Sequence, residues 1–135
     1  MAVQLSTTAR NNRLDSIETT IGTAPLLTLR TGGQPANCAA ADSGSLLATL
    51  TLPSDWLAAA ASGAKAIANG PWTGTGSGAG TAAHFRIKDS GGTNTHLQGS
   101  VTATGGGGDL TLDNAVIASG QAISISAFTL TDGNA

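Results

Sequence analysis

The chain has 135 residues, a formal net charge of −2 and a single cysteine, and 19 of its residues are glycine. Charged residues make up 10% of the chain and aromatic residues 3%, so titratable and nucleophilic groups are too sparse to predict a catalytic cluster. The length is that of one domain. The lone cysteine excludes a disulfide within the chain. We therefore expect a protein that is not an enzyme and holds no cofactor or metal.

The charge and hydropathy patterns also bear on partners and location. Six scattered basic residues disfavour nucleic-acid binding, which needs clustered Lys and Arg. The opening MAVQLSTTAR lacks the apolar core of a secretory signal, and no run approaches the roughly 18 apolar residues of a membrane span. We expect synthesis in a cytoplasm and no membrane binding. Because a core so poor in aromatics is thin, we also expect a homo-oligomer that buries further apolar surface.

Residues 6–21 predict a helix. Leu14, Ile17 and Ile21 recur at helical spacing and would form one apolar stripe. A hydroxyl side chain at 6–8 can cap the first turn, and Gly22 supplies a stop.

The predicted helix also carries four charged residues in a chain otherwise poor in charge. Arg10, Arg13, Asp15 and Glu18 would face solvent or a partner. Residues 1–24 are accordingly expected to form an N-terminal helical arm that docks on another protein. The alternative is a helix that packs on the edge of a sheet.

After residue 24 the pattern changes to short apolar segments separated by Gly-rich turns, which is typical of an all-β fold. Residues 25–135 are expected to form a single β-sandwich, jelly-roll or immunoglobulin-like. One helical turn is expected at 56–58, and flexible or irregular segments at 34–45, 72–83 and 105–108. The expected strands cover residues 26–30, 46–52, 65–68, 84–88, 95–104, 110–112, 116–117 and 121–130.

Three patterns with possible chemistry are each outweighed by a structural interpretation. Gly74–Gly80 superficially matches a phosphate-binding loop, but a strand follows it and no Gly-Lys-Ser/Thr is present. His84 and His96 could be neighbours in one hairpin, but no spacing points to further metal ligands. Cys38 is expected to be a small buried hydrophobe.

Two further sets of residues could bind a ligand, and for each a structural role is the favoured interpretation. Asp109, Asp113 and Asn114 resemble no EF-hand loop and are expected to cap turns rather than to hold Ca²⁺. Trp56 and Trp72 could stack on sugars or anchor an interface if exposed. A place in the core is the favoured alternative for both.

Several segments resemble the small virion proteins of tailed bacteriophages. The resemblance spans most of the chain, and the sequences that carry it are MAVQLST (1–7), RLDSIETTIG (13–22), PANCAAADSG (35–44), HFRIKD (84–89), TATGGGGDL (102–110) and FTLTDG (128–133). No catalytic motif accompanies them. The resemblance implies a structural protein of the particle.

We therefore expect a capsid decoration (cement) protein that binds the major capsid protein on the phage head and stabilises the shell. Its location would be the virion, after assembly in the host cytoplasm. The alternative is a tail or fibre-associated component that contacts tail proteins or a surface glycan. The residues expected to contact the partner are Arg10, Arg13, Asp15 and Glu18, followed by Trp56 and Trp72.

Overall fold

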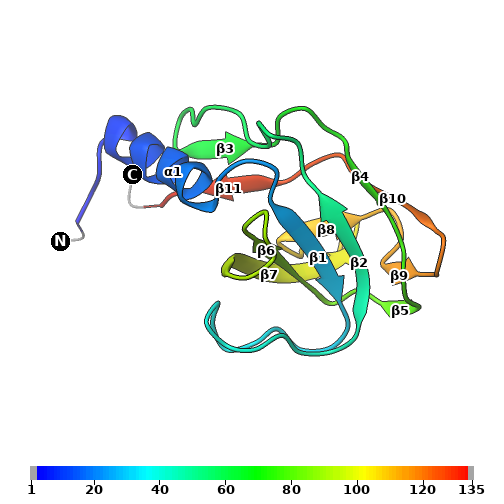
Figure 1. The fold of residues 1–135 in the computed structure, drawn as a ribbon. Helices are drawn as coiled ribbons and strands as arrows, with labels where there is room; N and C mark the ends of the chain where they lie inside the picture. Colours follow the sequence, from blue (N-terminus) through cyan, green and yellow to red (C-terminus); the bar gives the residue numbers. More distant parts are fainter. Residues whose placement is uncertain (1–2, 134–135) are drawn as a thin grey trace.

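The helix predicted at the N-terminus is present. The computed structural model describes residues 3–133, and in it α1 runs from Thr7 to Ile21 (Figure 1). Ser6 Oγ accepts a hydrogen bond from the amide of Ala9, and the amide of Gly22 closes the helix on the carbonyl of Glu18. The predicted cap and stop are therefore both confirmed. Within the described residues no helix is long and apolar enough to cross a membrane.

The largest sheet has the strand order β2-β1-β6-β7-β8. Its neighbours are antiparallel, except that β7 and β8 are parallel. Alternate side chains of β1 and β6 point into the core, among them Leu27, Leu29, Phe85 and Ile87. The strands are β1 (Leu26–Arg30), β2 (Leu46–Thr51), β6 (His84–Lys88), β7 (Thr95–Ala103) and β8 (Leu110–Leu112).

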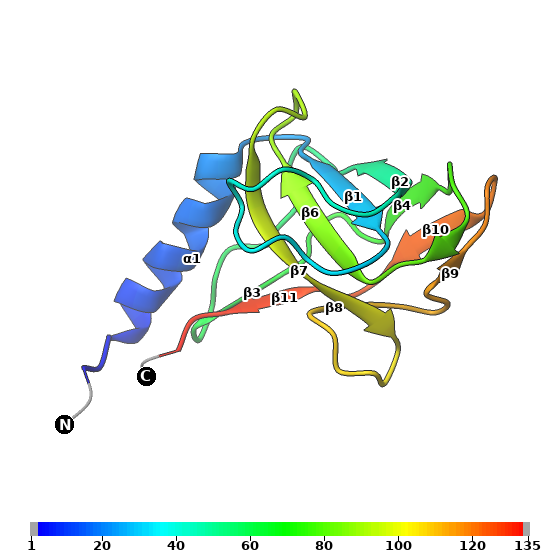
Figure 2. The ribbon, with the colours of Figure 1, turned by 90° about the horizontal axis from the view of Figure 1, so that it is seen from below.

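Three short antiparallel pairs complete the fold and curl it. They are β3 (Ala64–Ala66) with β11 (Thr129–Thr131), β4 (Trp72–Thr75) with β10 (Ala122–Ile125), and β5 (Gly80–Thr81) with β9 (Val116–Ile117). A bridge from Ala48 to Gly76 joins the edge of β2 to the segment after β4, and β10 in turn contacts β8. β2, β4 and β10 lie next to one another in Figure 2. A mainly β fold after one N-terminal helix is confirmed. The single β-sandwich is not, since the strands form a curled sheet with short added pairs.

Two segments differ from the predicted elements. Residues 56–58 form no helical turn, because Leu57 bridges to Ile67 in an extended conformation and Trp56 lies in the core. The single strand predicted at 121–130 is divided at residues 126–128, because β10 pairs with β4 whereas β11 pairs with β3. Residues 1 and 2 of the predicted arm and residues 134 and 135 of the predicted β-sandwich lie outside the described residues.

The Gly-rich segment 72–83 is packed instead of forming a flexible loop. It contains β4 and β5, and the amides of Ser77 and Gly78 both donate to the carbonyl of Leu47. A Cβ on Gly76 would collide with the carbonyl of Ala118, and one on Gly78 would lie 2.6 Å from the carbonyl oxygen of Leu46. These glycines therefore allow one backbone to approach another closely.

The two Trp and two Phe residues form a continuous row in the core. Ring centroids are 6.0 Å apart for Trp56 and Trp72, 5.9 Å for Trp72 and Phe128, and 5.6 Å for Phe128 and Phe85. Their tilted and edge-on arrangements are those favoured by aromatic quadrupoles. This row joins the end of α1 to β4 and β6, since Trp56 Nε1 also donates to the carbonyl of Gly22.

We predict that Gly78→Ala destabilises the protein by about 1–3 kcal/mol, because the added methyl forces two backbone segments apart. Gly33→Ala is the matched control, since Gly33 is exposed and a Cβ there meets no atom within 4 Å. Urea unfolding followed by circular dichroism measures both. Equal midpoints for the two variants would contradict the close-packing role of Gly78.

Candidate functional site

The two acidic residues of α1 converge on a buried lysine of β3. Lys65 is 2% exposed, and its Nζ lies 2.7 Å from Asp15 Oδ1 and 3.0 Å from Glu18 Oε2. Nζ also donates to the carbonyl of Ala58 at 2.9 Å. An ammonium group has three donors, and each of them finds an acceptor here, which offsets the cost of burying the charge. The side chains of Asp15 and Glu18 therefore hold α1 on the sheet.

The ionisation of this cluster follows from the same contacts. Burial is the largest single influence on the pKa of Lys65 and lowers it. The hydrogen bonds and charges of Asp15 and Glu18 together outweigh burial, so the pKa lies above the ordinary 10.5. The pKa of Asp15 is held below 3.8, chiefly by its hydrogen bond from Lys65 and then by the amide of Ala60.

A polar stripe on α1 pairs with the backbone of residues 57–63. Asn11 Oδ1, Asp15 Oδ1 and Glu18 Oε1 accept hydrogen bonds from the amides of Gly63, Ala60 and Leu57. This stripe was not predicted from the sequence. Its signal was present, since three acceptor side chains at spacings of four and three residues lie on one helix face. Their partners are distant in the sequence and have no motif of their own.

The two arginines of α1 reach the C-terminal segment. Arg13 Nε lies 3.1 Å from Asp132 Oδ2, and Arg10 Nη1 donates to the carbonyl of the same residue at 3.4 Å. The side chain of Arg13 remains 57% exposed, whereas those of Asp15 and Glu18 are 44% and 22% exposed. Of the four charged residues predicted to dock on a partner, Arg13 is thus the most accessible.

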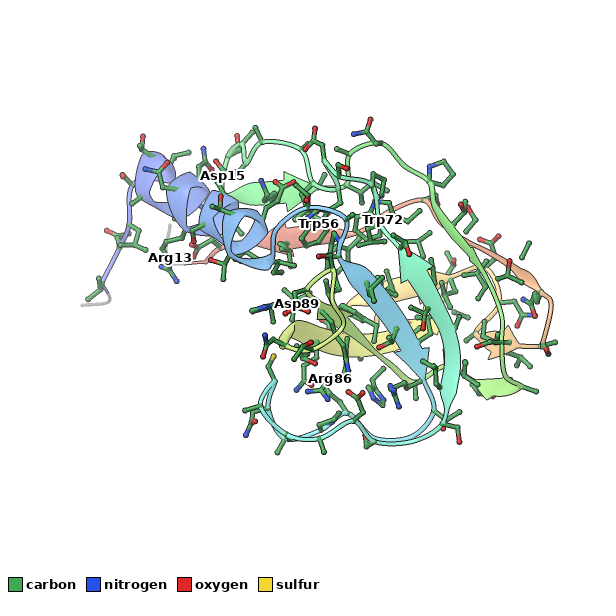
Figure 3. The ribbon with its side chains drawn as sticks, viewed as in Figure 1. Arg13, Asp15, Trp56, Trp72, Arg86 and Asp89 are labelled. Atoms are coloured by element: carbon green, nitrogen blue, oxygen red, sulfur yellow. The ribbon has the colours of Figure 1, made fainter. Side chains whose placement is uncertain are left out.

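Trp56 and Trp72 are core residues. They are 0% and 1% exposed, respectively, and lie between the end of α1 and the strands (Figure 3). The prediction that both side chains lie in the core is confirmed. The prediction that they contact a partner is wrong, because both are buried. An indole must present an open face to stack on a sugar, and neither ring does so in this fold.

A second buried cation holds the loop at residues 34–45 against the outer face of the sheet. Arg86 is 1% exposed and donates to the carbonyls of Asn37, Cys38 and Ala40 at 2.9–3.3 Å (Figure 3). Its Nη1 also lies 2.6 Å from Asp42 Oδ1. The fork of guanidinium donors suits this set of acceptors on one loop.

Asp42 forms ion pairs with three cations on the outer face of the sheet. Arg30 Nη2 lies 3.1 Å and Lys88 Nζ 2.7 Å from Asp42 Oδ2, in addition to the bond from Arg86. Partial burial is the largest influence on the pKa of Asp42 and raises it. The hydrogen bonds from Lys88 and Arg86, with the charge of Arg30, outweigh it and hold the pKa below 3.8. A polar hollow of about 660 Å³ lies beside this cluster and is also lined by His96.

The two histidines are not neighbours. His84 begins β6 opposite Ser100, whereas His96 is at the other end of the hairpin, next to Thr95, which pairs with Lys88. His84 is fully buried with Nδ1 2.9 Å from the carbonyl of Gly32, and His96 is exposed. They form no catalytic or metal-binding pair.

The remaining candidate groups also have structural positions. Cys38 is a free thiol and only half-buried. Asn114 caps the amide of Val116, as expected for a turn-capping side chain. Asp109 instead accepts hydrogen bonds from the amide and hydroxyl of Ser100 in β7. Among residues 3–133, no three His, Cys, Asp or Glu side chains gather closely enough to hold a metal ion.

We predict an asymmetry when the Lys65 cluster is broken. Lys65→Met should cost about 1–3 kcal/mol, because an apolar chain replaces the ammonium and both carboxylates can still be hydrated. The double variant Asp15→Asn/Glu18→Gln should destabilise more, because it leaves a buried charge with neutral partners. Chemical unfolding of both variants tests this, and a double variant more stable than Lys65→Met would contradict the assignment.

We also predict that stability falls at both ends of the pH range. The folded-state pKa values of Asp15 and Asp42 lie below the unfolded value of 3.8, so their stabilisation is present above 3.8 and is lost as pH falls through the folded values. The Lys65 contribution is present below 10.5 and is lost as pH rises through its higher folded value. Urea midpoints should separate the parent from Asp42→Asn at pH 6 and converge towards pH 2. A constant difference would refute the Asp42 assignment.

The charged and aromatic residues of this chain mainly organise the fold. Two buried cations fasten α1 and the loop at 34–45 to the strands, and the aromatic row packs in the core. Comparison of the chain with protein-family models, with characterised proteins and with solved structures found no match.

Proposed function

We propose that this protein is a non-enzymatic structural component of a tailed-phage virion, specifically a decoration protein that binds the assembled head. The proposal rests on the segments that resemble small virion proteins, which are distributed along the chain from residue 1 to residue 133. Its partner would be the major capsid protein, and several copies would associate as a homo-oligomer on the shell.

One structural observation supports this use of the resemblance. The resembling segments contact one another across the fold. Arg86 in the segment 84–89 binds the segment 35–44, and Arg13 in the segment 13–22 binds Asp132 in the segment 128–133. Residues that share a pattern because of a common fold are expected to include such long-range contacts. These segments therefore include residues that stabilise the fold of this chain.

The mechanism follows from linkage. A decoration protein that binds the assembled shell and not its dissociated subunits stabilises the shell. The stabilisation grows with the concentration of the decoration protein relative to its Kd for the shell. α1 suits such docking because Lys65 fixes it to the body, so that little further ordering is needed on binding. Arg13 is the exposed cation of this helix.

The test is sedimentation of the purified protein with undecorated heads of the phage that encodes it. The parent should co-sediment, and Arg13→Glu should bind about tenfold more weakly, equivalent to about 1.4 kcal/mol. The Arg13 side chain is 57% exposed, but its partner Asp132 is only 8% exposed. The circular dichroism spectrum and urea midpoint of Arg13→Glu are therefore compared with those of the parent, so that a loss of binding is not a loss of folding.

Val116→Ser is the control, since Val116 is 57% exposed on β9 and belongs to none of the predicted contact residues. Failure of the parent to bind heads would refute the proposal. Binding to purified tails in place of heads would favour the tail-associated alternative.

A further inference from the structure

Two strand edges face each other across a hollow without pairing. β7 pairs with β6 along one side, but β8 covers its other side only from Val101 to Ala103. β11 pairs with β3 on one side. A hollow of about 420 Å³ between β7 and β11 is lined by residues of both strands, which run past each other in Figure 2.

The outward edge of β11 follows from its hydrogen bonding. The amide of Asp132 donates to the carbonyl of Gly63, so Leu130, two residues earlier, also directs its backbone groups towards β3. Thr129 and Thr131 alternate with these residues and direct their N–H and C=O groups away from β3. Among the described residues, neither backbone finds another partner.

Along β7 the backbone N–H and C=O groups likewise point alternately towards β6 and away from it. The amide of Val101 donates to the carbonyl of Ala83, so Gly99 and Leu97 face β6. Ser100 and Gln98 then face the other way, and the amide of Ser100 is capped by Asp109. The backbone of Gln98 is left open towards the hollow, within the part of the chain that is described.

The floor and the charge of the hollow restrict what can occupy it. Phe85, Phe128, Leu97 and Leu130 supply an apolar floor. Asp109 lies at one end and, among residues 3–133, has no cation within 4 Å. At the other end Thr131 also lines a second hollow against α1, where Asp132 is already paired with Arg13.

We propose that this groove, defined by Gln98, Thr129 and Thr131 with its floor, binds an extended segment of the shell protein by strand addition; the inference rests on the proposed function. Backbone groups of the added strand pair with Thr129 and Thr131. An apolar side chain of that strand packs on the floor, and a Lys or Arg lies beside Asp109. The binding strand therefore combines extended backbone, an apolar anchor and a flanking positive charge.

The decisive measurement is hydrogen exchange at residue resolution on the wild-type protein, free and bound to undecorated heads. The amides of Gln98, Thr129 and Thr131 should exchange at least about tenfold more slowly in the bound state, whereas the loop at 105–107 should be unchanged. Binding without protection of these amides would overturn the strand-addition inference and leave the proposed function standing. No binding at all would overturn both.

Proline substitutions supply an independent test. Thr129→Pro and Thr131→Pro each remove one outward-facing N–H while sparing the ladder to β3, a placement that edge strands tolerate. Each should weaken head binding about tenfold, whereas Thr131→Val, which keeps the amide, should bind like the parent. Folded proline variants with parental affinity would refute the inference, and if neither variant folds, the exchange measurement on the wild type decides.

Discussion

The row of four aromatic side chains is the contact on which the rest of the structure depends. The four rings come from four separate parts of the chain, and each contacts the next in the order Trp56, Trp72, Phe128 and Phe85. The two Trp and two Phe are the whole aromatic complement of the protein, so this core has no substitute for any of them. Because Trp56 also donates to Gly22, the row sets where α1 ends relative to the strands.

Two buried cations then fasten the outer parts to this core. Lys65 holds α1 against β3, and Arg86 holds the loop at 34–45 against the outer face of β6. In each case carboxylates and backbone carbonyls together surround the charge, which makes its burial tolerable. Such contacts specify one arrangement, since a shifted helix or loop would leave the charge without partners. Nine of the 14 charged residues of this chain thus take part in ion pairs within the molecule.

This use of charge changes which surfaces are available to a partner. The carboxylates of Asp15 and Glu18 and both indole rings are occupied by the fold, so the exposed Arg13 and the open backbone edges at β7 and β11 carry the proposed interactions. Recognition by backbone pairing depends little on side-chain charge. It therefore suits a protein whose surface is rich in small, neutral residues.

The sequence by itself determined the elements whose signals are local. The α1 boundaries follow from Ser6 and Gly22, and the strands at 26–30 and 84–88 from short apolar segments that end at Gly-containing turns, because caps and turn signals act within a few residues. Only the tertiary structure decided that the glycines of 72–83 pack against other backbones and that the apolar run at 121–130 serves two different partners. It also decided that Asp15 and Glu18 of α1 form ion pairs with Lys65. The physical reason is that close approach, strand partnership and charge pairing depend on residues far apart in the chain, whose positions no local pattern encodes.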